Sequence, residues 1–215
     1  MIRPGEEWGS PARGPADVEV TGSDADLAAA VTRRPGILVR FRPDATSDLA
    51  GAVGIAGAAA HDVEVALDLL RLDDGDAAVN MVVVGTPPDR VRTFTRCFGA
   101  NVRIDERPVF HGPCTTVIVA TGQFRDGLDV VPRGHPGDGR AEIQVYAVAR
   151  AERRLLRARL ATGTHVPHPG ITQRSGRHVT VSTGRRVPLQ VDGRPRAATD
   201  RVDITLDAGA YRLLL

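Results

Sequence analysis

The sequence predicts a mainly β protein of the α+β type, built as a two-layer antiparallel β-sandwich with a few flanking helices. From Gly170 to the end, short alternating apolar runs recur between turns at regular spacing, as in a sandwich or barrel. The dipeptide Asp192-Gly193 is a strong signal for a two-residue hairpin. The stretch Ala120–Val148 places dense glycine and proline punctuation between two apolar β-type runs, a pattern typical of strand, loop, strand.

Composition indicates an ordinary globular protein. The 215 residues, 42% hydrophobic and 25% charged, are enough for one large domain or two small ones. The chain has no lysine, and its net charge of +2 is too small to indicate nucleic acid as a partner. No segment is typical of a membrane span or a signal peptide, so we expect a cytoplasmic protein, with peripheral membrane contact left open. Cys97 and Cys114 match no metal or redox spacing, which favours reduced thiols and leaves one disulfide open.

The first part of the chain predicts a tail and a small mixed unit. Residues 1–16 are rich in glycine, proline and charge, which favours a flexible tail. Residues 17–57 carry alternating strand and helix signals. They predict a strand at Val18–Val20, a helix over Ala25–Arg33 capped by Ser23, a strand over Ile37–Phe41 broken by Pro43, and a helix over Asp48–Val53 between a Thr46 or Ser47 cap and Gly54.

The sandwich domain is predicted over residues 58–215, with helices beside its strands. Helical spacing of apolar residues predicts a helix over Ala58–Leu70, and a short basic helix is expected over Asp89–Phe98. A third helix, with an apolar and an arginine-rich side, is expected over Ala151–Leu160, closed by Gly163. Strands are expected at Ala77–Val84, Thr116–Ala120, Ile143–Val148, His178–Ser182, Val187–Val191, Val202–Leu206 and Tyr211–Leu214.

Two small groups of polar residues are candidates for a catalytic or metal-binding site. Asp138 and Glu142 flank the start of the second strand in the Ala120–Val148 stretch, although Asp138-Gly139 taken alone favours a tight turn. His165 and His168 form a pair, but the prolines around them favour an irregular loop with surface histidines over a zinc site.

The order of these features resembles the diacylglycerol kinase and sphingosine kinase-like lipid kinases, including the bacterial YegS-like group. The similarity is to their C-terminal β-sandwich domain and the segment before it, over roughly residues 37–214. Family motifs such as Asn-Asp-Phe-Ala, Asn-Gly-x-Tyr, Gly-x-His and Gln-x-Asp-Gly-Glu have counterparts in the same order. In the order of these four motifs, the counterparts are Ser47-Asp48-Leu49-Ala50, Thr121-Gly122-Gln123-Phe124, Gly163-Thr164-His165 and Gln190-Val191-Asp192-Gly193-Arg194. Shorter matches between them are Val53-Gly54-Ile55, Leu67-Asp68-Leu69, Val79-Asn80 through Val84-Gly85, Val131-Pro132 and Asp138-Gly139.

The chain departs from this family where the nucleotide would bind. The resemblance implies a preceding nucleotide domain with a Gly-Gly-Asp-Gly-Thr phosphate loop, but the sequence lacks that motif and residues 17–57 fit only a remnant of the domain. The family's Gly-Thr-Gly-Asn-Asp segment is replaced by the run Asp44-Ala45-Thr46-Ser47-Asp48. Because a carboxylate repels a triphosphate unless a metal bridges them, ATP binding by this chain is expected to be weakened.

The resemblance implies roles for several residues. Asp138 occupies the position of the family's general base, with Glu142 near a second acid, and Ser47 and Asp48 lie on the nucleotide side. Arg125 and Arg194 are candidate contacts for a lipid or anion. Arg194 replaces the closing glutamate of a hairpin motif, which either makes the rim of the site anion-binding or has no role in a surface turn; the sequence slightly favours the second.

Two functions follow from the resemblance. The favoured one is a catalytically degenerate lipid-binding or regulatory module, whose Arg-rich helix rests on anionic lipid headgroups. The alternative is an active lipid kinase, completed by a separate nucleotide-binding chain or a rewired phosphate site. Only the alternative requires ATP and Mg²⁺. A lipid, an anionic membrane surface, a second copy of the chain or a nucleotide-binding chain are the expected partners, and nucleic acid is not.

Overall fold

The protein is built on one large, mostly antiparallel sheet, with a separate two-stranded sheet and few helices, which confirms the predicted fold class. The computed structural model describes residues 8–55 and 63–215. Its helices are α1 (Asp24–Thr32), α2 (Asp48–Val53) and α3 (Arg153–Ala158), with single 3-10 turns at Pro88–Arg90 and Leu160–Thr162. Its strands are β1 (Ser10–Pro11), β2 (Val18–Gly22), β3 (Leu38–Pro43), β4 (Val63–Leu72), β5 (Ala77–Ala78), β6 (Met81–Gly85), β7 (Phe98–Ile104), β8 (Arg107–Cys114), β9 (Thr116–Ala120), β10 (Phe124–Arg125), β11 (Leu128–Asp129), β12 (Ala141–Tyr146), β13 (Ile171–Gly176), β14 (His178–Val191) and β15 (Arg194–Leu214).

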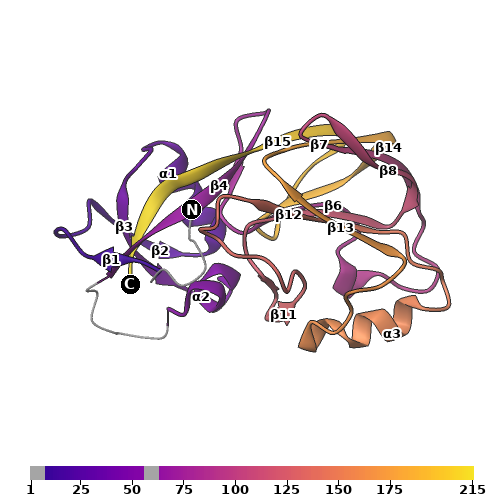
Figure 1. Ribbon diagram of the computed structural model, residues 1–215, viewed down its shortest axis with the longest axis horizontal. Helices are drawn as coiled ribbons and strands as arrows, with labels where there is room; N and C mark the ends of the chain where they lie inside the picture. The colour runs from indigo at the N-terminus through magenta and orange to yellow at the C-terminus, as the bar shows by residue number, and fades with distance from the viewer. Residues whose placement is uncertain (1–7, 56–62) are drawn as a thin grey trace.

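The main sheet runs in the order β1-β4-β15-β14-β6-β9-β12-β13, and β2, β3, β5, β7 and β8 branch from this path. Figure 1 shows β4 and β15 extending from the end of the molecule that holds α1 and α2 toward the end that holds the β7–β8 hairpin. The helix α3 lies below that second end in the same view. None of the helices in the described part of the chain has the length and apolar character needed to cross a membrane.

The hairpin β14–β15 connects the two layers. Its turn is Asp192-Gly193, as predicted, and both residues have the positive φ that such a turn requires, 45° and 73°. The sequence predicted four short strands here, but β14 and β15 each run through two of them, because bulges let the long strands bend. On one edge, β14 pairs first with β7 and, past a register shift after Ser182, with β6. The sheet therefore branches and folds over itself.

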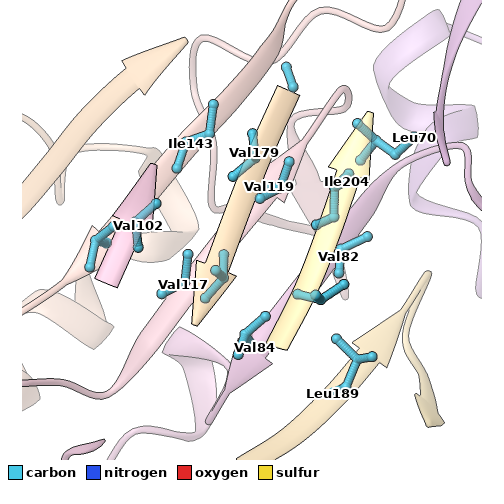
Figure 2. Packing of buried hydrophobic residues seen from close by; sticks show 14 of the residues in the cluster. Leu70, Val82, Val84, Val102, Val117, Val119, Ile143, Val179, Leu189 and Ile204 are labelled. Carbon is cyan, nitrogen blue, oxygen red and sulfur yellow. The ribbon is translucent and has the colours of Figure 1, made fainter. Parts of the chain in front are cut away.

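The main hydrophobic core lies between these layers. Figure 2 shows valine, leucine and isoleucine side chains from different strands meeting there, among them Val82 (β6), Val119 (β9), Val179 (β14) and Ile204 (β15). The strand predicted over Ala77–Val84 is divided into β5 and β6, and β6 is buried over its whole length, as its continuous apolar sequence favours. A second core cluster lies around α1, α2 and β3.

The N-terminal unit joins the same sheet through parallel pairing. The strands β2 and β3 are parallel, with α1 as the crossover between them, and β3 pairs in parallel with β15. The predicted helix caps are confirmed: Ser23 begins α1 with a capping box that includes Asp26, and α2 begins after Ser47 and ends at Gly54. Pro43 is the last residue of β3 rather than a break after Phe41.

Two predicted helices are wrong. The segment expected as a helix over 58–70 contains strand β4 from Val63 onward, and residues 58–62 lie outside the described part. Its apolar residues do follow helical spacing, but seven of the ten residues of β4 are buried, including neighbours such as Leu69 and Leu70 that point to opposite faces of the sheet, and an apolar pattern of this kind does not distinguish a buried strand from a helix. The segment 89–98 forms only the turn Pro88–Arg90 and an extended loop that leads into β7.

The β7–β8 hairpin was not predicted. Its two-residue turn is Asp105-Glu106, and both residues have positive φ, 47° and 65°. Glutamate rarely adopts this conformation, so the turn lacks the usual asparagine or glycine signal. The helix expected over 151–160 is present in shorter form as α3, and Gly163 closes the following 3-10 turn with φ 65°, as predicted.

Gly54 is important because it ends the short helix that carries Asp48. Gly54 has φ 74°, and none of the residues in the ranges 8–55 and 63–215 lies where an added methyl group would touch it, so a Gly54→Ala substitution mainly tests the backbone conformation. We expect it to lower the free energy of unfolding by about 1 kcal/mol. Gly99→Ala is the matched control, since Gly99 also has open space but no positive φ. Equal stability of the two variants in urea denaturation would contradict the prediction.

Candidate functional site

An acidic cavity of about 340 Å³ lies where the starts of α1 and α2, the start of β6, the β10 strand and the β14–β15 turn meet. Its lining includes two arginines, Arg125 and Arg194, and the backbone turn of Gly193. Six aspartates also line it: Asp24, Asp26, Asp44, Asp48, Asp126 and Asp192. Segments that are distant in the sequence thus bring together an unusual number of carboxylates.

Asp24 holds the two N-terminal helices together. It is buried at the first turn of α1, and its carboxylate accepts hydrogen bonds from the Ser47 hydroxyl and from the backbone N–H groups of Asp48 and Leu49, the latter two at 3.1 Å. These donors begin α2, so Asp24 caps a second helix from the side. The predicted nucleotide-side residue Ser47 therefore donates its hydroxyl to Asp24 and is not part of the cavity lining.

Asp192 has a matching role on the opposite wall. Its carboxylate accepts three backbone hydrogen bonds at the start of β6, from Val79 N–H at 2.8 Å, Asn80 N–H at 3.0 Å and Met81 N–H at 2.9 Å. The hairpin turn that the sequence predicted therefore also anchors a neighbouring strand.

Both carboxyl groups have raised pKa values. Burial is the main cause for each, and it raises the pKa of Asp24 to about 6 and that of Asp192 to about 7. The negative charge of Asp24 is the second cause for Asp192, so the two groups oppose each other's ionisation. The donated hydrogen bonds act in the opposite direction and lower both pKa values.

The N-terminal end of α1 is occupied by the chain's own side chains. Asp26 accepts hydrogen bonds from the Ser23 N–H at 3.0 Å and the Ser23 hydroxyl at 2.7 Å. Arg194 donates to Asp26 and to Ser23, each at 2.8 Å. These hydrogen bonds, the Ser23 ones first, lower the pKa of Asp26 to about 2. Arg194 thus lines the cavity and binds α1, rather than lying in a surface turn with no contacts.

Asp48 and Arg125 are the other predicted residues in the cavity. The Asp48 carboxylate accepts from the backbone N–H groups of Asp126 and Gly127, at 2.8 and 3.0 Å. Arg125 is buried and its Nε donates to Asp89 at 3.1 Å, with Asp126 also within ion-pair distance. Both arginines of the cavity are therefore already engaged with carboxylates.

Asp138 and Glu142 are not part of the cavity lining. Asp138 is partly buried and accepts a hydrogen bond from Arg140 N–H at 2.9 Å, while Glu142 is 8% exposed on β12. Burial raises the pKa of Glu142, Arg133 lowers it and Asp138 raises it. Nearby, buried Asp68 accepts from the N–H groups of Gly139 and Gly209. The two predicted catalytic acids thus belong to a second acidic cluster, and their catalytic roles stay predictions.

The cavity residues do not fit a nucleoside triphosphate. A phosphate there would meet carboxylates, because the Asp26 side chain lies at the start of α1 and accepts from the Ser23 N–H and hydroxyl, and because both arginines are paired. Across residues 8–55 and 63–215, no three histidine, cysteine or acidic side chains are arranged to hold a metal ion. No residue set in this cavity is therefore assigned to ATP or Mg²⁺.

Sequence reasoning missed Asp24, Asp26 and the anchoring role of Asp192. The signal was present in the strand-to-helix turn Gly22–Asp26, whose sequence Gly-Ser-Asp-Ala-Asp keeps the glycine and the central aspartate of a Gly-Gly-Asp-Gly-Thr loop. The same residues also carry the helix-cap signal of Ser23, which conceals this similarity. The prediction that His165 lies on the surface was wrong: its ring is buried and stacks on Tyr146.

The comparisons agree with this architecture. The family described as the YegS C-terminal NAD kinase beta sandwich-like domain matches residues 70–214. A diacylglycerol kinase from Bacillus anthracis str. Sterne has the same fold, with a TM-score of 0.74 and 15% identity over 92% of this chain and 77% of its own. An NAD kinase from Archaeoglobus fulgidus solved with ATP matches at a TM-score of 0.53 and 12% identity, over 93% of this chain and 78% of its own. A search of curated proteins found no match. Since the match spans most of the chain, the protein belongs to the YegS C-terminal NAD kinase beta sandwich-like family.

Proposed function

We propose that this chain is a degenerate member of the lipid kinase group that does not transfer phosphate on its own and acts as a lipid-binding or regulatory module. The observation that carries the proposal is the acidic cavity at the start of α1. Phosphoryl transfer depends on positioning the phosphates and neutralising their charge. This cavity is lined by six aspartates and by two arginines that are already paired with carboxylates. Its negative potential therefore opposes both the positioning of phosphate groups and the neutralisation of their charge.

The start of α1 supports the same conclusion. A helix N-terminus attracts phosphate through free N–H groups and a positive end of the helix dipole. Here the Asp26 carboxylate lies at that end and accepts from Ser23, with Arg194 as its counter-ion. A phosphate would have to displace this network before it could bind.

Calorimetric titration of the purified chain with ATP, with and without Mg²⁺, tests the proposal. We expect no heat of binding up to millimolar ATP, because the cavity repels the triphosphate. Micromolar binding that is lost in Asp48→Ala and kept in Asp138→Ala would overturn the proposal. Asp138 is the matched control, since it is an aspartate of the same chain that does not line the cavity.

One observation favours the alternative of a lipid kinase completed by another chain. Glu142 is buried beside Asp138 with a raised pKa, a property common among catalytic acids and bases. In that case phosphorylation of diacylglycerol vesicles would occur only after a separate nucleotide-binding chain is added. The activity would then be lost in Glu142→Gln.

A further inference from the structure

One surface of the protein concentrates positive charge far beyond its average. It consists of the loop 90–97 and the segment 150–161, which includes α3, and we call it the arginine surface. These two segments contain eight arginines and a single acid, Glu152, whereas the whole chain has a net charge of only +2. Six of the eight arginines are exposed: Arg90, Arg92, Arg96, Arg150, Arg154 and Arg159. The remainder of the molecule is therefore net acidic.

Most of these exposed arginines have no acidic partner. Arg90 lies 3.6 Å from an oxygen of Asp89. The other five form no ion pair with any residue in the described ranges 8–55 and 63–215, whereas arginines elsewhere, such as Arg71 and Arg196, do. A cluster of unpaired guanidinium groups repels itself, and an anionic partner would relieve that repulsion.

The two segments are joined into one rigid surface by the remaining arginines. Arg153 is 3% exposed, and its guanidinium donates to the carbonyl groups of Val148, Thr93 and Thr95 at 3.1, 3.1 and 2.8 Å. Arg157 donates to the Val91 carbonyl at 2.8 Å. Both arginines use their charge to hold the loop against α3, which fixes the shape of a loop without regular secondary structure.

The loop and the helix each present one apolar side chain to solvent. Phe94, at the tip of the turn Arg92–Thr95, is 82% exposed, and Leu155 on α3 is 57% exposed. A third large hydrophobic residue with marked exposure, Val63, lies on β4 at 39%. Exposed apolar residues surrounded by basic side chains are the composition of surfaces that insert into the interfacial region of a bilayer.

We propose that the arginine surface binds an anionic membrane, with Phe94 and Leu155 inserted among the acyl chains and the exposed arginines on lipid phosphates. Arginine forms forked hydrogen bonds with phosphate, and each basic residue near an anionic surface adds to the attraction. Contacts with a nucleic-acid backbone are polar and would leave Phe94 and Leu155 in water, whereas a bilayer buries both side chains, which favours the membrane over nucleic acid. This inference rests on the lipid-binding part of the proposed function and deepens it by naming the surface and the class of lipid. Because the arginine surface does not line the acidic cavity, vesicle binding can fail while the absence of ATP binding still holds, and the reverse.

Flotation of the full chain with lipid vesicles tests the inference. We expect binding to vesicles of phosphatidylcholine with 30% phosphatidylglycerol, and little binding to pure phosphatidylcholine or at high salt. Arg154→Glu with Arg159→Glu should weaken binding by at least tenfold. Arg185→Glu is the control, because Arg185 is an exposed arginine on β14 that belongs to neither segment of the arginine surface, and it should leave binding unchanged.

Insertion is tested separately from charge. Phe94→Ser with Leu155→Ser should weaken vesicle binding by about tenfold. Phe94→Trp in a Trp8→Phe background should show a blue-shifted emission with anionic vesicles, since Trp8 is the only native tryptophan. Unchanged binding by the double serine variant, no blue shift, or binding to duplex DNA without binding to vesicles would each overturn the proposal.

Discussion

Replacing Asp192 with alanine is expected to lower the free energy of unfolding by roughly 3 kcal/mol, since each donor left without an acceptor costs about 1 to 3 kcal/mol. The side chain accepts three backbone hydrogen bonds from Val79, Asn80 and Met81, where β6 begins. Water from the adjacent cavity can reach some of these groups, which is why the expected loss is below the sum of three full penalties. Alanine is also disfavoured at the φ of 45° that Asp192 adopts.

The variant Asp192→Asn separates these causes. Asparagine tolerates positive φ and keeps one carbonyl oxygen, so we expect about half of the loss seen with alanine. Urea denaturation at constant pH measures both variants. A loss below 1 kcal/mol for Asp192→Ala would mean that β6 does not depend on the hairpin turn for its start, and would contradict the anchoring role described above.

The parts of the fold that were predicted correctly depend on short-range signals. The caps Ser23 and Ser47 and the glycines Gly54 and Gly163 act within one helical turn, so the local sequence contains all that is needed. The turn Asp192-Gly193 is equally local. The strand β4 was missed because its assignment depends on burial by β15 and β5, and no window of its own sequence contains those partners.

The candidate site was predicted only in part for the same reason. Asp48, Arg125 and Arg194 were found through resemblance, and the structure brings them to one cavity. The carboxylate of Asp24 lies there because it bonds to α2, and Asp192 because it bonds to β6, and both are contacts between segments far apart in the sequence. Asp138 and Glu142 were grouped with the other site residues, but the packing of Gly139 on Asp68 places them in a second cluster.

Raising the pH from 5 to 8 is expected to lower the stability of the protein through Asp24 and Asp192, by roughly 2 kcal/mol for the pair. The folded state raises their pKa values from 3.8 to about 6 and about 7, so it holds the two protons more tightly than the unfolded chain does. The stabilisation is complete below pH 3.8 and is lost as the pH rises through 6 and 7. This change is smaller than the two pKa shifts alone would give, because Asp192 lines the cavity and is only partly buried.

His165 acts in the opposite direction, since burial lowers its pKa below 6.5 and acid therefore favours the unfolded state. The comparison must consequently be made between the wild type and Asp24→Asn, which share His165. The variant removes one ionisable group and also relieves its repulsion on Asp192, so its stability should depend less steeply on pH between 5 and 8. Urea denaturation at each pH gives the two slopes. Parallel pH profiles would show that Asp24 has the same pKa in the folded and unfolded states. Its carboxylate would then be held by the N–H groups of α2 strongly enough to offset its burial completely.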